Sequence, residues 1–332
     1  MKRDYLSRSF ILLAVISFLS LFFAADAGRQ TPAPEGEFLA DGCTVVMVGK
    51  DASADGSIMT THTADCGICD WTWRHIPAAD YPAGSTRKIY HISQIRTWPP
   101  AEGLKWDLYL KDFTGLEIPQ ILHTYAFHHG VFGYMNEHQL AIGESTIGNV
   151  RKIHNPTPAP KMDITMLTLL AMERCRTVRE AIRLMGGLAE KYGYGFLDGG
   201  EMLAVADPKE VWVFEIMPAG PLWTPTSGKP SAVWCAQRVP DDEVSVCPNE
   251  SRIGEIDLKN PDYFMASPNV ISFAVEQGLY DPKSDRLFVK YNHFGVYNSE
   301  KRVRERPQTS SAPGWWKKAI KVYDILLEPP EK

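Results

Sequence analysis

Residues 41–66 read DGCTVVMVGKDASADGSIMTTHTADC, and this stretch decides the fold. Residues 43–48 form a continuous apolar run, which predicts a buried strand. Residues 49–56 have the chemistry of a turn, and residues 57–61 predict a second strand that returns beside the first. A cysteine directly after Asp-Gly at the start of a strand is an unusual packing residue. Cys43 is better placed to become a new N-terminus.

Residues 1–27 have the composition of a secretory signal peptide. The first eight residues are basic, residues 10–25 carry no charge, and small residues near 24–27 suit cleavage. The apolar run is shorter than the ~20 residues that a membrane-spanning helix usually needs. An uncleaved membrane anchor is the alternative, and both interpretations place the body of the protein outside the cytosol.

Residues 28–42 predict a disordered linker or propeptide, because they contain proline and show no apolar period. Its removal between Gly42 and Cys43 would leave Cys43 with a free α-amine. Residues 43–332 are enough for a single large domain with a full core.

The charge and cysteine content indicate which kinds of partner and which disulfides to expect. The net charge is −5 and charged residues make up 23% of the sequence, so no nucleic-acid partner is expected. Disulfides are expected in an exported protein. If Cys43 stays a free nucleophile, at least one further thiol of the odd remainder is unpaired. The sequence has six cysteines, Cys43, Cys66, Cys69, Cys175, Cys235 and Cys247.

The order of predicted elements indicates a layered α+β domain, since strand hairpins are followed by helices and then by more strands. Asp163 and the Thr177–Glu180 capping-box pattern mark two helix starts. Helices are expected at 164–173, 178–185 and 269–277. Gly186-Gly187 weakens the middle of a helical part that reaches Tyr192, and residues 188–191 restart the helix. Strands are expected at 88–93, 123–127, 130–135, 139–143, 202–206, 211–216, 232–238 and 243–246.

Cys66 and Cys69 form a CxxC motif, for which redox, zinc-binding and structural roles are considered. Thioredoxin-like redox chemistry would need a βαβ setting, whereas this motif follows a hairpin and precedes a Trp-rich loop. Zinc would need four ligands, and His62 with the two cysteines gives three at most. A local structural role is the leading interpretation, and a redox or zinc-binding module is the alternative.

Several stretches resemble one enzyme family, the secreted cysteine dipeptidases of the dipeptidase A type. This family belongs to the N-terminal-nucleophile hydrolases, together with penicillin V acylase and the bile salt hydrolases. The resemblance implies a four-layer αββα sandwich, self-cleavage that exposes the cysteine, and hydrolysis of dipeptides. Family members often run further, so the chain is expected to be short at its C-terminal end. The matching stretches are residues 43–57, 133–146, 203–215 and 236–255.

Cys43 would act as both nucleophile and carrier of its own base. A free thiol has a pKa of about 8.5, and the thiolate is the nucleophile. An α-amine has a pKa of about 7.7–8.0, so it is partly neutral near pH 7 and can take the thiol proton. Acylation would release the amine product, and water would then hydrolyse the thioester.

The resemblance implies further site residues. Asp65 is similar to the family aspartate that fixes the new amine and thiol. Asn136 and Asn249 resemble asparagines that bind substrate or the oxyanion. An arginine that favours thiolate is matched by Arg302, with Arg304 close behind. Taken singly, each of these residues suits an ordinary turn or surface role, and only their order behind a removable leader indicates a site.

His62 is a departure from the family pattern, because many relatives carry arginine three residues before the aspartate. A histidine there can still contact substrate, but its charge depends on pH. Asn249 also begins an Asn-Glu-Ser glycosylation sequon. A glycan would be incompatible with a buried catalytic Asn249.

The sequence therefore predicts an exported cysteine dipeptidase that hydrolyses small peptides and needs no metal or other cofactor. No stable membrane span is expected after signal removal, and a homo-oligomer is left open. One alternative is an N-acyl amide hydrolase with the same machinery and a different pocket. Another is an exported domain without hydrolase activity, either thiol-redox or purely binding.

Overall fold

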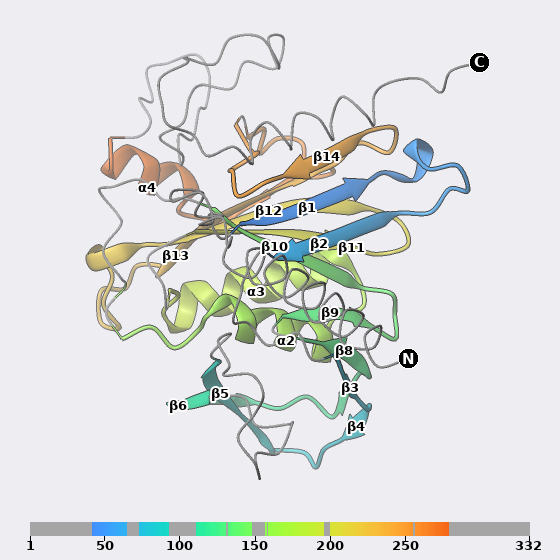
Figure 1. Ribbon diagram of the computed structural model, residues 1–332. Coiled ribbons are helices and arrows are strands. Elements are labelled where there is room, and N and C mark those ends of the chain that lie inside the picture. Colours follow the sequence, from blue (N-terminus) through green and yellow to red (C-terminus); the bar gives the residue numbers. More distant parts are fainter. Residues whose placement is uncertain are drawn as a thin grey trace, which may run out of the picture. The chain divides into compact units, whose positions relative to one another are not determined.

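A computed structural model gives the structure of the chain (Figure 1). The chain divides into two units, residues 1–40 and 41–332. The predicted signal peptide, the CxxC motif and the C-terminal tail lie outside the described residues. The structure describes residues 42–64, 73–92, 111–130, 132–147, 157, 159–195, 200–254 and 256–278, all in the second unit.

The first hairpin lies in a three-stranded sheet of order β14-β1-β2. Strand β1 (Cys43–Val48) has the predicted bounds, and β2 (Met59–Ala64) begins slightly later than predicted. The two strands pair antiparallel along their whole length, so Cys43 lies opposite Ala64. On its other side β1 pairs with β14 (Val244–Cys247). The predicted nucleophile is therefore the first residue of a central strand.

A larger sheet of eight antiparallel strands has the order β15-β13-β12-β11-β10-β9-β8-β3. Strands β11 and β12 are buried at every residue, and their sequences are apolar except for one glutamate each, Glu201 and Glu215. The strands are β3 (Arg74–Ile76), β8 (Phe127–His129), β9 (Gly133–Asn136), β10 (Ala141–Ile147), β11 (Gly200–Ala206), β12 (Val211–Pro218), β13 (Ala232–Arg238) and β15 (Phe264–Ala266).

Two helices begin at the predicted caps. The Asp163 side chain accepts a hydrogen bond from the Met166 backbone at the start of α2 (Ile164–Arg174). A reciprocal capping box between Thr177 and Glu180 starts α3 (Val178–Tyr192). Both caps satisfy backbone N–H groups that lack a partner inside the helix.

The Gly-Gly pair does not interrupt α3, which continues to Tyr192 instead of weakening after Met185. The reason is close packing, because a Cβ at Gly186 would overlap the indole ring of Trp234. Gly187 has open space around its missing Cβ. Tertiary contact at Gly186 thus outweighs the poor helix propensity of glycine.

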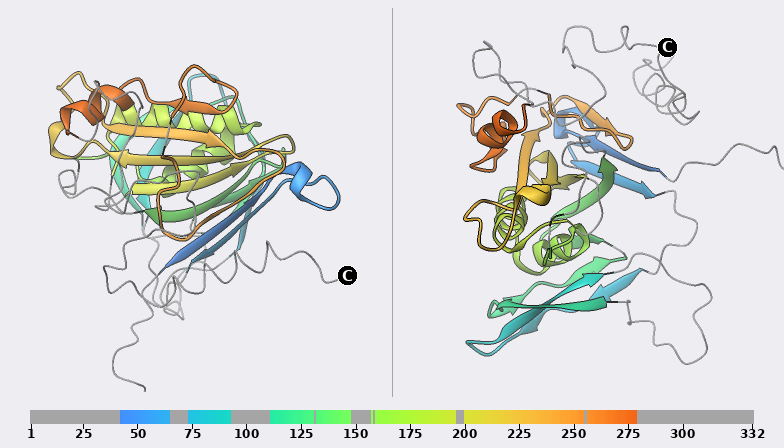
Figure 2. Two further views of the ribbon diagram at one scale, coloured as in Figure 1. Left: turned by 90° about the horizontal axis from the view of Figure 1, so that it is seen from above. Right: turned by 90° about the vertical axis from the view of Figure 1, so that its left-hand side faces the viewer.

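The large sheet lies between helices and the small sheet (Figures 1 and 2), and its alternate residues pack against these different layers. Leu203 and Val205 of β11 belong to the apolar cluster that contains α2 and α3. Met202 and Ala204 belong to a second cluster, which contains Val45 of the small sheet. The large sheet is therefore covered by helices on one face and by the three-stranded sheet on the other. The four-layer αββα arrangement stays a prediction, since the described residues supply an α, a β and a β layer.

Smaller elements complete the described part. The β5–β6 hairpin contacts α2 on the side away from the large sheet, and α4 joins the second apolar cluster. No helix among the described residues has the length and apolarity that crossing a lipid bilayer requires. These elements are β4 (Ala79–Asp80), β5 (Thr86–Ile92), β6 (Lys111–Pro119), β7 (His123–Thr124), α4 (Val270–Glu276) and the 3₁₀ turns η1 (Lys50–Ala52) and η3 (Gly220–Leu222).

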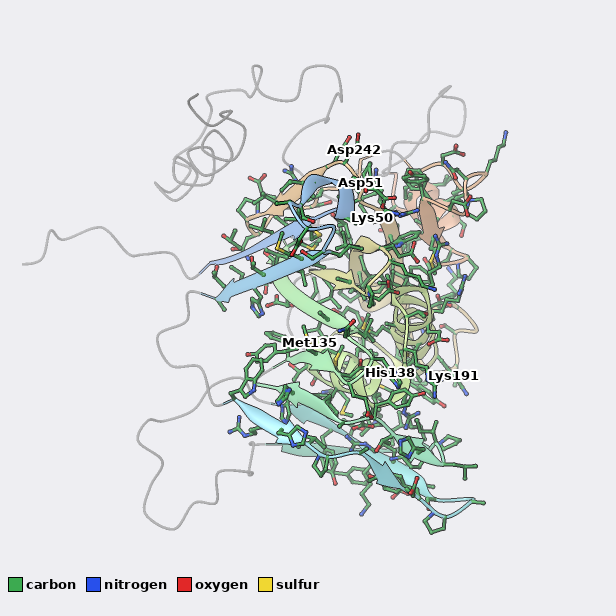
Figure 3. The ribbon with its side chains drawn as sticks, turned by 90° about the vertical axis from the view of Figure 1, so that its right-hand side faces the viewer. Lys50, Asp51, Met135, His138, Lys191 and Asp242 are labelled. Atoms are coloured by element: carbon green, nitrogen blue, oxygen red, sulfur yellow. The ribbon has the colours of Figure 1, made fainter. Side chains whose placement is uncertain are left out.

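The far end of the first hairpin is anchored to the turn that follows β13. Lys50 Nζ lies 3.1 Å from a carboxylate oxygen of Asp241, and the Asp51 N–H donates to the Asp241 carbonyl at 2.7 Å. Figure 3 shows Lys50, Asp51 and Asp242 gathered at this end. A Cβ at Gly49 would overlap the backbone of the same turn. The strand that begins at Cys43 is thus held at its distal end.

Candidate active site

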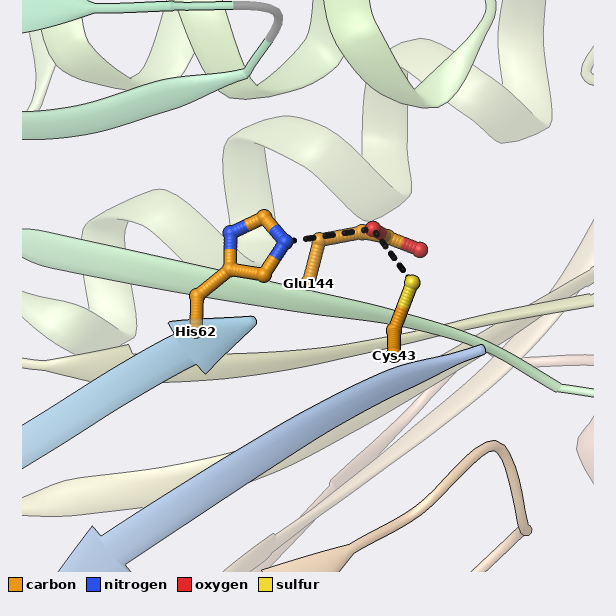
Figure 4. A group of neighbouring side chains, drawn as sticks. All are labelled: Cys43, His62 and Glu144. Carbon is orange, nitrogen blue, oxygen red and sulfur yellow. Dashed lines mark hydrogen bonds and ion pairs between the residues drawn. The ribbon is translucent and has the colours of Figure 1, made fainter. Parts of the chain in front are cut away.

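Three side chains from three strands meet at the start of β1 (Figure 4). Cys43 Sγ lies 4.0 Å from Glu144 Oε2, and His62 Nε2 lies 3.7 Å from the same oxygen. All three of these atoms lie within 4.8 Å of one another. A thiol, an imidazole and a carboxylate are the side chains of nucleophilic catalysis, and they are also metal ligands.

Strand register explains this convergence. Cys43 lies opposite Ala64 and Val45 lies opposite His62, so Cys43 and His62 are diagonal neighbours on one face of the β1–β2 pair. Strand β10 approaches closely because Gly143 lacks a side chain. A Cβ there would lie 3.0 Å from the Thr61 carbonyl oxygen. Glu144 follows directly, and its side chain reaches Cys43 and His62.

Glu144 belongs to a pair of buried carboxyl groups. Its side chain is 2% exposed, and Thr146 Oγ1 donates to Glu144 Oε1 at 3.0 Å. Glu201 lies opposite Thr146 in the sheet and hydrogen-bonds Glu144. Burial raises the pKa of both carboxyls, and the charge of Glu144 raises the pKa of Glu201 further, well above its ordinary value. Of the two carboxyls, Glu201 therefore has the stronger preference for the neutral, protonated form.

The nucleophile and its neighbour are both neutral in this state. Burial, with the nearby charge of Glu144, raises the pKa of the Cys43 thiol to about 12. Burial also lowers the pKa of His62 to about 4. His62 therefore does not supply at neutral pH the permanent positive charge of an arginine.

Asn249 is brought directly to the nucleophile. The Cys43 N–H donates to Asn249 Oδ1 at 2.5 Å, and Asn249 Nδ2 donates to the Thr146 carbonyl at 2.7 Å. Because Cys43 N must donate and the Thr146 oxygen must accept, the amide orientation is chemically fixed. Asn249 thus lies beside Cys43, with its amide oxygen facing the nitrogen of Cys43. Its role toward an oxyanion stays a prediction.

A buried carboxylate holds the loop that carries Asn249. Glu215 of β12 accepts from Ser251 Oγ at 2.6 Å, from Ile253 N at 3.0 Å and from Arg252 N. The Asn249 backbone N–H also donates to Ser145 Oγ at 3.0 Å. These bonds fix the loop relative to both sheets, so the amide of Asn249 is preorganised.

Asn136 has a different environment from the one predicted. Its Nδ2 donates to the carbonyls of Met172 and Cys175 at 3.1 and 2.8 Å. Its Oδ1 accepts from the backbone of His138 and Leu140 at 3.0 and 3.1 Å. The amide thus joins the β9–β10 turn to the end of α2, which is a structural role. In this hairpin Glu144, rather than Asn136, is the residue beside Cys43.

Sequence reasoning missed the carboxyl pair. Glu144 and Glu201 are the charged residues of two otherwise uncharged strands, AIGESTI and GEMLAVA. A carboxyl group in such a strand is rarely buried without a partner, and that signal could have identified both residues. The predicted roles of Asp65 and Arg302 fall on residues outside the described part and stay predictions.

A series of aromatic rings in contact extends from His62 through Tyr134 to Trp73. The ring centroid of His62 lies 5.7 Å from that of Phe132 and 6.2 Å from that of Tyr134. Trp73 stacks on Tyr134 at 5.0 Å and on His128 at 5.2 Å, and it is 62% exposed. An exposed aromatic face next to a nucleophile is suited to binding the side chain of a substrate.

The four described cysteines, Cys43, Cys175, Cys235 and Cys247, form no disulfide. Burial raises the pKa of all four thiols, and Cys43 is the one that is only half-buried and lies beside an imidazole and a carboxyl group. Cys43 is therefore the best-placed nucleophile among the described cysteines.

Comparison with known proteins identifies the family. A "Probable dipeptidase" of Salmonella dublin is 28% identical over 306 residues, which is 86% of this chain and 62% of the relative. A "Probable dipeptidase" of Latilactobacillus sakei is 25% identical and covers 86% of this chain and 54% of the relative. A "Probable dipeptidase A" of Streptococcus pyogenes serotype M3 is 24% identical over 82% of this chain and 53% of the relative. The chain thus spans a little over half the length of these relatives.

The predicted resemblance to the dipeptidase A type is confirmed by these names and by a family match over most of the chain. The sequence model of Peptidase family C69 matches residues 42–317, and the match begins one residue before Cys43. The chain belongs to Peptidase family C69.

Proposed function

We propose that this chain is a cysteine dipeptidase whose nucleophile is Cys43, with the α-amine of Cys43 as its base. The observation that carries the proposal is the environment of Cys43, whose nitrogen is bonded to Asn249 and whose thiol lies beside Glu144. The family and the names of the relatives support dipeptide hydrolysis.

Activation begins with cleavage of the Gly42–Cys43 bond. The Cys43 thiol attacks the Gly42 carbonyl, the peptide nitrogen takes the thiol proton and leaves, and a thioester forms. Water then hydrolyses the thioester to a Gly42 carboxylate and restores the thiol. The nitrogen that donates to Asn249 becomes a free amine, and Asn249 keeps one N–H in place while the lone pair is available to the thiol.

Cleavage at Gly42 would favour ionisation of the Cys43 thiol, whose pKa is high in the intact chain. In the intact chain the thiol of Cys43 has a pKa of about 12 and rests as a neutral group. Transfer of its proton to the new amine creates an ammonium beside the thiolate, and that positive charge offsets burial and the negative charge of Glu144. Catalysis of peptide hydrolysis therefore depends on cleavage.

Glu144 favours a dipeptide over an N-acyl amide as substrate. A reacting carbonyl carbon approaches Sγ to about 3–3.5 Å. The α-ammonium of a dipeptide lies about 2.5 Å from that carbon, given standard bond lengths. The ammonium is thus within reach of the Glu144 carboxylate, which lies 4.0 Å from Sγ. An acylated nitrogen has no charge to bring there.

The first test determines the N-terminus of the purified protein by intact mass and N-terminal sequencing. We expect the wild-type chain to begin at Cys43 and the Cys43→Ala variant to retain residues upstream of it. A wild-type chain that keeps Gly42 attached, yet hydrolyses dipeptides, would overturn the role of the α-amine.

The second test separates the two substrate classes with the Glu144→Gln variant. We expect the KM for dipeptides to rise at least about tenfold, because hydrogen bonds to charged groups contribute about 1.5–3 kcal/mol. N-acetylated dipeptides, measured side by side, serve as the uncharged control and should be poor substrates for both proteins. Preferential hydrolysis of the acetylated compounds by the wild-type enzyme would favour the acylase alternative.

We also propose that the protein is exported, on the strength of the basic, apolar and small-residue segments of residues 1–27. Fractionation of the producing cells provides the check, with a variant lacking residues 1–27 as its control. Retention of the full-length chain in the cytosol would contradict export.

A further inference from the structure

We propose that Cys43, His62 and Glu144 form a site for a thiophilic divalent cation of the zinc class, and that the bound cation blocks the nucleophile. The site consists of three side chains that are present before and after cleavage at Gly42. The inference therefore does not depend on dipeptide hydrolysis, and binding of the cation is measured separately from activity.

The spacing of the three donor atoms is close to that of a tetrahedral zinc site. Zinc bond lengths of about 2.3 Å to sulfur and 2.0–2.2 Å to nitrogen or oxygen give separations of about 3.4–3.6 Å between ligand atoms. The observed separations are 3.7 Å from His62 Nε2 to Glu144 Oε2 and 4.0 Å from Cys43 Sγ to that oxygen. The third pair, Cys43 Sγ and His62 Nε2, lies within 4.8 Å. Shifts of a few tenths of an ångström at Glu144, and of up to about 1 Å between Cys43 and His62, would bring the three atoms to coordination distance through side-chain rotation.

His62 provides an available donor atom. Its Nε2 is buried and has no hydrogen-bond partner within the described part of the chain. A buried polar atom without a partner is costly, and a ligand that accepts its lone pair would remove that cost. Phe132 and Tyr134 pack against the imidazole and hold its orientation.

The charges also balance. A divalent cation with one thiolate and one carboxylate has no net charge, which suits a half-buried site. The thiol proton is released to solvent on binding. Glu201 stands behind Glu144 as its hydrogen-bond partner and orients it, as partners of metal ligands usually do. The fourth position is left for water.

Occupation would inhibit the enzyme, because the sulfur lone pair that attacks a carbonyl would instead be bound to the cation. This differs from a catalytic zinc site, in which the protein ligands are not the nucleophile. The site would thus protect the thiol reversibly until the cation is removed.

The test uses the purified full chain, freed of metal by a chelator. Zn²⁺ is titrated by calorimetry, and Co²⁺ is titrated by absorbance, since tetrahedral thiolate coordination gives intense visible bands and a sulfur charge-transfer band. We expect one equivalent of either ion and slower alkylation of Cys43 by iodoacetamide in the presence of Zn²⁺, followed by mass spectrometry.

Three variants remove one ligand each: Cys43→Ala, His62→Gln and Glu144→Gln. We expect each to weaken Zn²⁺ binding more than about 10²-fold, since even outer-shell partners cost about 10–100-fold. His123→Gln is the matched control, because His123 is a half-exposed imidazole paired with Asp80, and it should bind like the wild type. Circular dichroism confirms that each variant is folded, and any two folded ligand variants suffice.

Several outcomes would contradict the proposal that Cys43, His62 and Glu144 bind a cation. Binding that survives Cys43→Ala but disappears in a Cys66→Ala/Cys69→Ala double variant would assign the ion to the CxxC motif. Unchanged binding in His62→Gln would reduce the site to a lone thiol. Absence of stoichiometric binding would end the proposal, whereas absence of dipeptide hydrolysis by the metal-free enzyme would count only against the proposed function.

Discussion

Asn249 combines an unusual backbone with an amide that contacts the nucleophile. Its φ of 56° lies in the left-handed region, which asparagine tolerates better than most residues. Nδ2, the atom to which a glycan at this sequon would attach, donates one of its two hydrogens to the Thr146 carbonyl.

Two substitutions at Asn249 separate the amide from the backbone. Asn249→Gly removes the amide and keeps the left-handed conformation, whereas Asn249→Ala removes the amide and strains the backbone. We expect both to lower kcat/KM by about 10²-fold or more, the order found when one positioned active-site hydrogen-bonding group is lost. Only the alanine variant should unfold at a markedly lower temperature. A fully active glycine variant would show that the amide does not serve the reaction.

The raised pKa of Glu201 predicts an unusual pH dependence of stability. Its pKa is raised in the folded state, so between the ordinary value of 4.5 and the folded value the native chain binds more protons than the unfolded chain. Stability is therefore lost as pH rises through this window. Glu201→Gln keeps a donor toward Glu144 without this proton, so the variant should gain melting temperature over the wild type from pH 5 to pH 8, and no gain should remain below about pH 4.

The control for this comparison is Glu243→Gln, which changes an exposed acid by the same atoms. Its melting temperature should follow that of the wild type across the series. An equal gain for both variants would show that general surface charge, rather than the buried pair, is responsible.

Among the helices and strands, α3 offers two neighbouring glycines whose substitution by alanine should have opposite effects on stability. Gly186 and Gly187 are neighbours in the helix, but a Cβ at Gly186 would overlap Trp234 and one at Gly187 would meet nothing within 4 Å. We expect Gly187→Ala to stabilise the chain by about 0.5–1 kcal/mol through helix propensity. Gly186→Ala should destabilise it by about 1–3 kcal/mol through overpacking. Denaturant unfolding measures both, and equal effects would contradict the packing seen here.

Elements with strong local signals were predictable from the sequence. β1 has its predicted bounds because a continuous apolar run ends in turn residues, and both helix starts follow from their caps. α3 runs unbroken through Gly186-Gly187 to Tyr192 because Gly186 packs against Trp234, which lies far along the chain, and no local pattern reveals that contact. The short strands β8 and β9 were misplaced by a few residues, since a strand of three or four residues carries little pattern.

At the scale of the whole molecule, the candidate site is made by contacts between distant parts of the chain. Cys43 meets Asn249 across 206 positions and Glu144 across 101 positions. Local patterns do not encode such contacts. Cys43 was indicated by its place at the start of a strand behind a removable leader, whereas Asn249 was predicted only from a family resemblance. The same resemblance pointed to Asn136, whose turn lies at the opposite end of β10 from the residues that reach Cys43. Glu144 became evident only from the packing of β10 against the β1–β2 hairpin.

The position of β1 between two partner strands has a consequence for the lifetime of the enzyme. Chain ends are normally the first parts to fray and to be trimmed. Cys43 is instead paired with Ala64, held through its nitrogen by Asn249, and continued by a strand with neighbours on both sides. If the proposed cleavage makes Cys43 terminal, this residue would keep the rigidity of a chain interior. Aminopeptidases bind an extended free end, so they would not be able to bind and trim this one. The proposed nucleophile would also need no ordering before each turnover.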